Sequence, residues 1–452
     1  MKSVIKEIDR IEEVRIYGSV TRVSGLTAEC GGLDKYLSLG SRLKIYPKKA
    51  QPINAEVVGI DHNHVLMMPF GSLEGVGVGD KVEVISADSV IYPSEDWLGR
   101  VINAFGEPID DKGLLAKGDE PYLLKNQPPP AQKRNRVGGK IDLGVRAMNA
   151  FTTCCEGQRM GIFSGSGVGK SMLMAMIAKY SSADVNVIGL IGERGREVQE
   201  FIEDYLGEEG LKRSIVIVST SDEPALLRKY AAFVTLAVAE YFRDSGKKVL
   251  CMIDSVTRFA MAQREIGLAA GEPPTSKGYT PSVFADLPKL LERAGPGTNN
   301  GSITGLFSVL VEGGDMEEPV ADAVRGILDG HIVLDRKIAE RGRFPAVNVL
   351  KSISRMMPNC NSEEQNKIVA RARELLSSYD DMAEMIRLGA YRKGSDVLVD
   401  EAIEYHPKIE HFLKQDSSDH TSLEKGYEML ANLLDMNDVN ANIAASQSEE
   451  EE

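Results

Sequence analysis

The segment that most constrains this chain is residues 164–171, Ser-Gly-Ser-Gly-Val-Gly-Lys-Ser. An apolar stretch at 160–163 precedes it, and a stretch rich in Met, Leu and Ala follows from residue 172. Closely spaced glycines let the backbone turn several N–H groups toward a phosphate, and the adjoining lysine and hydroxyl serve the β/γ-phosphates and Mg²⁺. A strand, this loop and a helix in succession therefore predict a nucleoside-triphosphate site in an α/β domain.

Every residue of this phosphate loop is expected to take part in nucleotide binding. Lys170 supplies a mobile positive charge, and Ser171 supplies an oxygen ligand for Mg²⁺. The strict pattern begins with glycine where this chain has Ser164, a small residue that the turn tolerates. The predicted cofactor-binding residues of the loop are Ser164, Gly165, Ser166, Gly167, Val168, Gly169, Lys170 and Ser171.

Composition is that of a soluble globular protein with several domains. The 452 residues are 42% hydrophobic and 27% charged, with a net charge of −14 that argues against a nucleic-acid-tracking protein. Because there is no membrane-length apolar run or signal-peptide pattern, we expect a cytoplasmic chain. The five cysteines lack metal-type spacing and are expected to be reduced; Cys154 and Cys155 fit a strand or turn better than a strained redox pair.

The pattern of apolar residues changes along the chain and divides it into successive parts. Helical spacing opens the chain, short β-prone runs follow, and apolar strands then alternate with helical stretches. Helical spacing returns near the end, ahead of a run of glutamates. We expect an amphipathic segment (1–13), a β-barrel domain (14–93), an α/β domain (94–356), a C-terminal helical domain (357–440) and an acidic disordered tail (441–452).

Two carboxylates stand where predicted strands end. Asp254 closes the apolar stretch 249–253, and an Asp at the carboxyl end of a strand beside a phosphate loop holds Mg²⁺ directly or through water. Glu193 follows the apolar stretch 187–191 and is our candidate for polarising the attacking water. A surface carboxylate paired with Arg194 or Arg196 is the alternative role for Glu193.

Several further stretches of the chain are distinctive when taken together with residues 165–171. They are 192–198 (Gly-Glu-Arg-Gly-Arg-Glu-Val), 254–259 (Asp-Ser-Val-Thr-Arg-Phe), 278–284 (Gly-Tyr-Thr-Pro-Ser-Val-Phe) and 352–355 (Ser-Ile-Ser-Arg). With them, nearly the whole chain resembles the hexameric ATPases of the rotary ATP synthase class, and within it the type III protein-export ATPases.

The resemblance implies a RecA-like P-loop ATPase core that uses ATP and Mg²⁺. It implies Lys170, Glu193, Asp254 and Arg355 as catalytic residues, Ser171 and Asp254 at the metal, and Arg355 acting from a neighbouring subunit. It also implies that Phe344, where Tyr is more usual, stacks against adenine.

The same resemblance implies partners and a place of work. It implies a homohexamer, a stator-like regulatory protein at the N-terminus, export-gate membrane proteins, export chaperones and unfolded substrates, at the cytoplasmic face of the inner membrane. The stretches 259–266 and 271–278 look more like the flagellar branch than the injectisome branch. A helix folded back on its own barrel is the alternative role for 1–13.

Two other functions fit parts of the sequence. A non-catalytic rotary-ATPase subunit is disfavoured by Glu193, because such subunits lack the catalytic carboxylate. A Rho-type RNA translocase requires aromatic and basic residues on the barrel, and the barrel region does carry them. They are Tyr17, Tyr36, Tyr46, Lys35, Lys44, Lys48 and Lys49.

Overall fold

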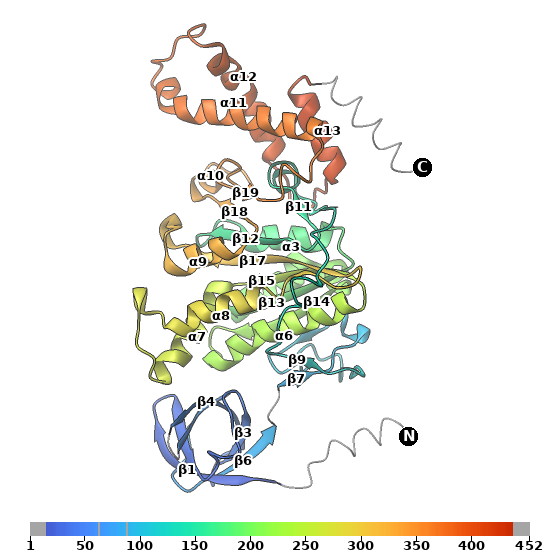
Figure 1. Cartoon of the computed structure of the whole chain (residues 1–452). Helices are drawn as coiled ribbons and strands as arrows, with labels where there is room; N and C mark the ends of the chain where they lie inside the picture. The colour runs from blue at the N-terminus through green and yellow to red at the C-terminus, as the bar shows by residue number, and fades with distance from the viewer. Residues whose placement is uncertain (1–14, 62–63, 87–88, 437–452) are drawn as a thin grey trace.

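The computed structural model describes residues 15–61, 64–86 and 89–436. They form three tiers: a β-barrel at one end, an α/β domain in the middle and a helical domain at the other end (Figure 1). The fold class expected from the sequence is therefore confirmed. The segment 1–13 and the tail 441–452 lie outside the described residues, and the domain boundaries stay predictions.

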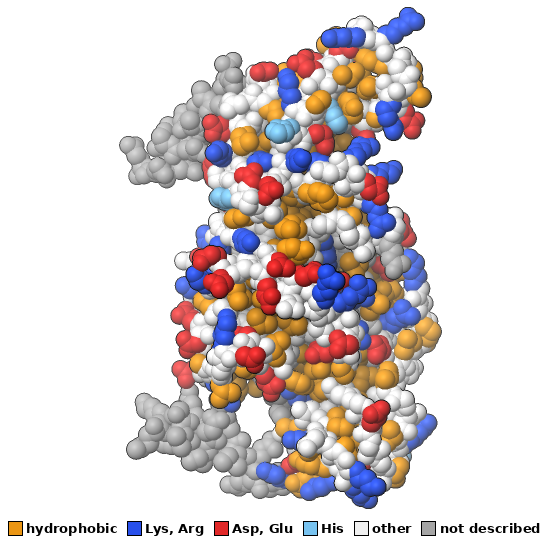
Figure 2. Space-filling model, turned by 180° about the vertical axis from the view of Figure 1, so that it is seen from behind, with side chains coloured by type: hydrophobic (Ala, Val, Ile, Leu, Met, Phe, Trp, Pro, Cys, Tyr) orange, Lys and Arg blue, Asp and Glu red, His pale blue; other side chains and the backbone are white. Residues whose placement is uncertain are grey.

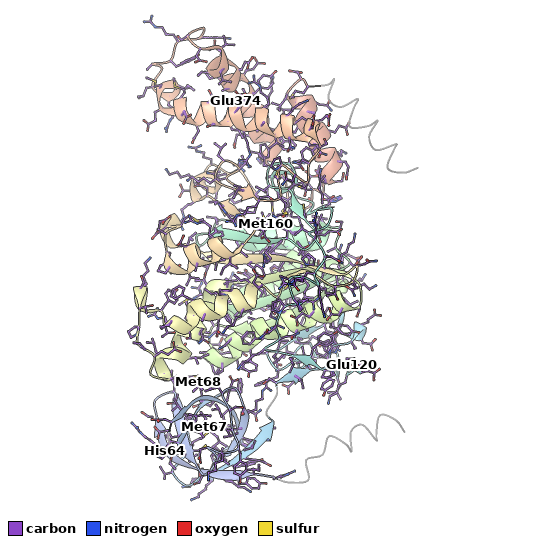
Figure 3. The ribbon with its side chains drawn as sticks, in the orientation of Figure 1. His64, Met67, Met68, Glu120, Met160 and Glu374 are labelled. Atoms are coloured by element: carbon purple, nitrogen blue, oxygen red, sulfur yellow. The ribbon has the colours of Figure 1, made fainter. Side chains whose placement is uncertain are left out.

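The first tier is a closed barrel of antiparallel strands in the order β1-β2-β5-β4-β3-β6. Burial alternates along β3, where Leu43 and Ile45 are buried and Lys44 between them is not. Met67, labelled in Figure 3, belongs to the same core. The strands are β1 (Tyr17–Ser24), β2 (Thr27–Gly31), β3 (Arg42–Tyr46), β4 (Ile53–Asp61), β5 (His64–Pro69) and β6 (Lys81–Ser86).

The middle tier is built on a nine-stranded sheet in the order β19-β18-β12-β17-β15-β13-β14-β8, with β16 beside β17. All neighbouring strands from β18 to β8 are parallel, whereas β19 and β16 are antiparallel to their neighbours. The strands are β8 (Val101–Ile102), β12 (Arg159–Ser164), β13 (Val185–Glu193), β14 (Ser214–Thr220), β15 (Lys248–Asp254), β16 (Gly295–Pro296), β17 (Ser302–Leu310), β18 (Gly330–Leu334) and β19 (Ile353–Ser354).

Helices cover both faces of this sheet, which explains why its central strands are apolar throughout. Neighbouring side chains such as Val187 and Ile188 therefore point into different cores. One core contains residues of α6 (Ala225–Asp244), α7 (Val256–Ala269), α8 (Pro281–Leu291) and α9 (Pro319–Ile327), and the other contains residues of α3 (Lys170–Tyr180) and of the C-terminal helices.

The third tier consists of α11 (Glu363–Arg387), α12 (Val397–Leu413) and α13 (Leu423–Leu433). Ser362 and Gln365 form a capping box that starts α11. The buried Arg146 fastens this tier to the α/β domain, since its guanidinium donates to the carbonyl oxygens of Phe412 and Lys414 and to Asp419. The described part of the chain is thus one packed body from the phosphate loop to α13.

Shorter elements complete the structure. They are β7 (Val90–Ile91), β9 (Tyr122–Leu123), β10 (Lys140–Ile141), α2 (Arg146–Phe151), β11 (Cys154–Cys155), α4 (Gly195–Glu200), a π-helix (Phe201–Leu206), α5 (Gly207–Lys212), α10 (Arg336–Glu340) and the 3₁₀ turns Glu95–Trp97, Ser276–Gly278 and Glu312–Gly314.

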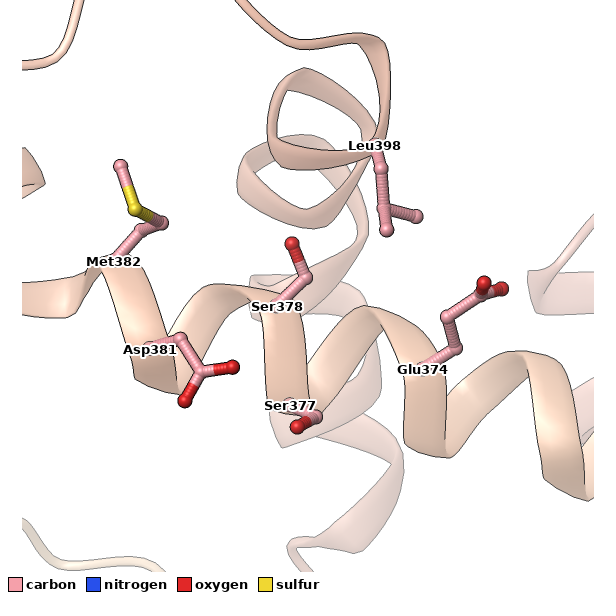
Figure 4. Close-up of a pocket in the computed structure, with 6 residues that line it drawn as sticks. All are labelled: Glu374, Ser377, Ser378, Asp381, Met382 and Leu398. Carbon is pink, nitrogen blue, oxygen red and sulfur yellow. The ribbon is translucent and has the colours of Figure 1, made fainter.

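Acidic, basic and apolar side chains are mixed over the face drawn in Figure 2. A hollow of about 430 Å³ lies between α11 and α12, where Leu398 faces the stretch of α11 that holds Ser378 (Figure 4). It contains none of the predicted site residues. Among the described residues, no helix is long and apolar enough to span a membrane.

Candidate active site

The phosphate loop joins β12 to α3, as its sequence predicts. Gly167 and Gly169 have φ angles of +75° and +88°, a left-handed conformation that residues with a Cβ rarely adopt. Gly169 directly precedes α3, so the free N–H groups of the first helical turn point back to the loop. Ser164 is buried, and its hydroxyl oxygen has no hydrogen-bond partner among the described residues. The loop has the shape and the donors that a phosphate group requires.

Lys170 contacts both carboxylates that the sequence singles out. Glu193 ends β13 and Asp254 ends β15, and both strands end at the same edge of the parallel sheet as β12. Lys170 Nζ lies 3.5 Å from Glu193 Oε1 and forms a closer ion pair with Asp254 Oδ1. Ser308, on the intervening β17, donates its hydroxyl to Asp254 over 2.6 Å. Strands far apart in sequence thus bring one ammonium group and two carboxylates together.

Water hardly reaches this cluster, and the pKa values of Lys170 and Glu193 are perturbed there. Their side chains are 11%, 14% and 3% exposed for Lys170, Glu193 and Asp254. Burial disfavours the charged form of Lys170, but Asp254 and Glu193 outweigh it and hold the Lys170 pKa above its usual value. Burial raises the pKa of Glu193 to about 7, an effect that Lys170 opposes and Asp254 assists. Glu193 therefore titrates near neutral pH, which suits a group that exchanges protons with water.

The donors at this edge also fit Mg²⁺. That ion prefers oxygen ligands and usually combines carboxylates with phosphate oxygens and water. Asp254 offers a carboxylate, and Ser171 offers a hydroxyl in the residue after Lys170. The chemistry of this donor set matches the metal that the sequence predicts.

Phe344 lies against the phosphate loop. Its ring would be 3.3 Å from a Cβ placed on Gly169, and the side chain is 45% exposed. Arg343 holds this segment, because its guanidinium donates to the carbonyl oxygens of Pro345 and Val347 and to Glu410 of α12. The carbonyl oxygen of Phe344 accepts a hydrogen bond from the backbone N–H of Gln415. An exposed aromatic face beside the loop is thus supported by the C-terminal domain.

Arg355 lies at the other end of the sheet. Its backbone N–H donates to Asp329, whose own N–H donates to Arg159, the first residue of β12. The phosphate loop begins at Ser164, the last residue of that strand, roughly 16 Å away at strand spacing. Arg355 is exposed. The structure therefore brings Lys170, Glu193 and Asp254 together but leaves Arg355 apart from them within one chain.

Two features beside the loop were not predicted from the sequence. Arg258, one helical turn after Asp254, packs over the backbone of Gly192, and its Nε is buried without a partner among the described residues. The sequence signal for Arg258 was its position four residues after Asp254, the carboxylate at the end of a strand. A small hollow of about 60 Å³ also borders α3, and only tertiary contacts define it. Its lining residues are Met172, Ala175, Met176, Lys179, Asp204, Tyr205 and Ser417.

Fold and site together define a P-loop nucleotide-binding protein with the domain order of the ATP synthase subunits. Three family models match it in that order: the "ATP synthase alpha/beta family, beta-barrel domain" at 13–84, the "ATP synthase alpha/beta family, nucleotide-binding domain" at 144–354 and the "T3SS EscN ATPase C-terminal domain" at 361–432. The chain belongs to the ATP synthase alpha/beta family, in the branch of the flagellar and type III secretion ATPases.

Individual relatives are similar to this chain over nearly their full length. The flagellum-specific ATP synthase of Caulobacter vibrioides is 58% identical, covering 96% of this chain and 99% of the relative. The type 3 secretion system ATPase of Xanthomonas euvesicatoria is 44% identical, covering 95% and 97%. The assembled ATPase EscN of the enteropathogenic E. coli type III secretion system superposes with a TM-score of 0.86 at 41% identity, covering 92% of this chain and 99% of EscN.

Proposed function

We propose that this protein hydrolyses ATP at the subunit interfaces of a homohexamer and so drives or assists flagellar type III protein export. The observation that carries the enzymatic part is the contact of Lys170 with Glu193 and Asp254 beside a phosphate loop. The flagellar assignment rests on the 58% and 51% identity to flagellum-specific ATP synthases of Caulobacter vibrioides and Bacillus subtilis. An injectisome ATPase is the second candidate, supported by the 44% identical Xanthomonas relative.

The chemistry follows from the charges at the loop. Backbone N–H groups of the loop and the ammonium of Lys170 bind the β/γ-phosphates, which replace the carboxylates as partners of Lys170. Mg²⁺, held by Ser171 and Asp254, would neutralise charge on the phosphates. Glu193 orients the attacking water and accepts its proton. We propose that Arg258, which packs over Gly192, contacts the γ-phosphate.

The transferring phosphoryl group needs a further positive charge. We assign it to Arg355 of the neighbouring subunit, because Arg355 of the same chain is tied to Asp329 at the opposite end of the sheet. In a head-to-tail ring, one surface of a subunit contacts a different surface of the next, so the Arg355 segment of one subunit can face the phosphate loop of its neighbour. The relative EscN was solved as an assembled ATPase, which supports such a ring for this chain.

The base of the nucleotide belongs beside Phe344. Its exposed ring lies next to Gly169, and the hollow that includes Met172 and Ser417 borders the helix that starts there. Aromatic and Met side chains supply flat or adaptable apolar contacts of the kind that a purine prefers.

The decisive experiment is ATP hydrolysis measured against protein concentration. A site that is completed between subunits predicts a specific activity that rises steeply with concentration, in step with assembly followed by light scattering. Equal specific activity in dilute monomer and in assembled protein, or no phosphate release at any concentration, would overturn the proposal.

We further propose that the protein works at the cytoplasmic face of the inner membrane with export-gate proteins, chaperones and unfolded substrates. A stalk partner is suggested by EscN, which was solved in complex with its central stalk EscO. The segment 1–13, outside the described residues, is our proposed docking site for a stator-like protein. Removing residues 1–12 is expected to abolish binding of that protein and leave melting temperature and basal ATPase activity unchanged. A lower melting temperature with binding intact would assign the segment to the chain's own fold.

A further inference from the structure

We propose that Arg336 is a positioning residue for nucleotide binding, because it holds one peptide unit of the phosphate loop in the orientation that a phosphate group requires. The guanidinium of Arg336 donates a hydrogen bond to the carbonyl oxygen of Ser166 over 3.0 Å. Arg336 belongs to the short helix α10, and 170 positions separate the two residues in the chain. The proposal deepens the proposed function and rests on it, since it concerns the same loop.

The peptide unit between Ser166 and Gly167 has little else to hold it. Both residues are exposed, and the bond from Arg336 is the one hydrogen bond that this unit makes in the described part of the chain. A Cβ placed on Gly167 would have no neighbouring atom within 4 Å. Gly167 has a φ angle of +75°, and glycine enters and leaves this conformation at low cost. The backbone alone therefore does not fix which way the unit faces.

Holding the carbonyl on one side directs the N–H to the other. In a planar trans peptide, the C=O and N–H bonds point in opposite directions. Because the Ser166 carbonyl points to Arg336, the Gly167 N–H points away from α10, and it donates to no other group among the described residues. Backbone N–H groups of such a loop cradle the α/β-phosphates. A flipped unit would present its carbonyl oxygen to the phosphates instead and would repel them.

The start of α10 is fixed by the side chain that precedes Arg336. Asp335 accepts a hydrogen bond from the backbone N–H of Lys337 over 2.9 Å and another from the Asn348 side chain over 3.1 Å. The same carboxylate lies 3.5 Å from Lys351 Nζ. Asp335 is thus engaged elsewhere, and Arg336 has no carboxylate partner within the described residues. Its guanidinium is available to the phosphate loop.

The stretch 335–348 touches the phosphate loop at two places. Arg336 contacts the loop at Ser166, and the ring of Phe344 lies beside Gly169. The two ends of the stretch are joined, because the backbone N–H of Asp335 donates to the carbonyl oxygen of Ala346. One small unit of the fold therefore supports the loop where the phosphates bind and carries the aromatic ring that we place beside the base.

Loss of the Arg336 bond is expected to weaken ADP and ATP equally. Both nucleotides carry the α- and β-phosphates that the loop binds. We expect a loss of about fivefold in affinity for each, the change that one hydrogen bond of ordinary strength produces. The loop holds the nucleotide in the ground state and in the transition state alike, so KM for ATP rises by about fivefold while kcat stays within about twofold.

The test compares three variants of the full-length protein. Arg336→Ala removes the bond to Ser166. Arg336→Lys keeps a donor, and because Ser166 accepts a single bond, we expect this variant to recover most of the affinity. Lys337→Ala removes a neighbouring positive charge without breaking the bond, and we expect wild-type affinity. Calorimetry measures binding of ADP with Mg²⁺, titration measures binding of a fluorescent ATP analogue, and steady-state hydrolysis gives KM and kcat.

The variants also separate positioning from folding. Arg336 and Lys337 are exposed, so melting temperatures without nucleotide are expected to equal that of the wild type. The proposal is overturned if Arg336→Ala binds ADP as tightly as the wild type, if only ATP binding weakens, or if Lys337→Ala causes the same loss. It is also overturned if Arg336→Lys recovers none of the affinity. A protein that needs Arg336 to bind ADP but never hydrolyses ATP would refute the proposed function and leave the role of Arg336 established.

Discussion

Replacing Glu193 by glutamine separates ATP binding from ATP hydrolysis. Glutamine keeps the size of the side chain and removes the negative charge that lies 3.5 Å from Lys170 Nζ. At an effective dielectric constant of about 20, two charges at that distance attract by about 5 kcal/mol, most of it offset by the lost hydration of the buried groups. Bound ATP must take Lys170 away from Glu193, so Glu193→Gln lowers the cost of binding.

Glu193→Gln is expected to tighten ATP binding slightly and to slow ATP hydrolysis strongly. If about 1 kcal/mol of the Lys170–Glu193 attraction survives as a net term, ATP binds up to about fivefold more tightly to Glu193→Gln than to the wild type. Turnover falls by about 10² to 10⁴, the usual contribution of a positioned general base. Titration with a fluorescent ATP analogue measures the change in ATP affinity, and single-turnover phosphate release measures the loss of hydrolysis.

Glu200→Gln is the matched control for this change. Glu200 stands on α4, close to Glu193 in sequence, and pairs with the exposed Arg196 over 2.8 Å. Its replacement is expected to alter neither binding nor turnover. Glu193 is not the general base if Glu193→Gln hydrolyses ATP within about threefold of the wild-type rate, or if this variant loses ATP binding together with hydrolysis.

Two further predictions follow from the same geometry. Because the pKa of Glu193 is raised to about 7 and the ionised form accepts the proton, kcat/KM is expected to rise with pH through about 7. A pH profile of ATP hydrolysis that is flat from pH 6 to 8 would contradict this. Glu410→Gln removes the charged partner of Arg343 and loosens the Phe344 segment, so KM for ATP is expected to rise by up to about tenfold with kcat unchanged. Glu404→Gln removes the partner of Lys408 on the same helix and is expected to leave KM for ATP unchanged. If steady-state kinetics show the same effect for both changes, Glu410 does not support ATP binding through the Phe344 segment.

Most of the fold follows from local patterns. The parallel strands are buried on both faces, so each one is a continuous apolar run. Such a run can be recognised in the sequence without knowing which strands lie beside it. The strand β2 has only a weak sequence signal, because Thr27–Gly31 is short and contains Glu29 and a glycine. Its strand conformation depends on pairing with β1 and β5, which single-sequence patterns do not record.

Part of the site likewise follows from local sequence patterns, and part depends on tertiary contacts. Lys170, Glu193 and Asp254 were predicted because the ends of parallel strands meet at one edge of the sheet, and the structure brings them together. Ser308 is one hydroxyl within a strand, and only the order of β17 and β15 places it on Asp254. The support of Phe344 by Gln415 joins residues far apart in the chain, so no spacing in the sequence indicates it.

The central claim is that each ATPase site is completed by a second subunit, and mixed assemblies test it most directly. Lys170→Ala removes the lysine that we propose binds the phosphates, and Arg355→Ala is expected to lower turnover by about 10³ with little change in ATP affinity. Each variant alone is therefore expected to be inactive. In a random equal mixture, about one quarter of the interfaces join an intact Lys170 to an intact Arg355. ATP hydrolysis by verified mixed hexamers is expected to recover toward that fraction of the wild-type rate, whereas no recovery would contradict the account.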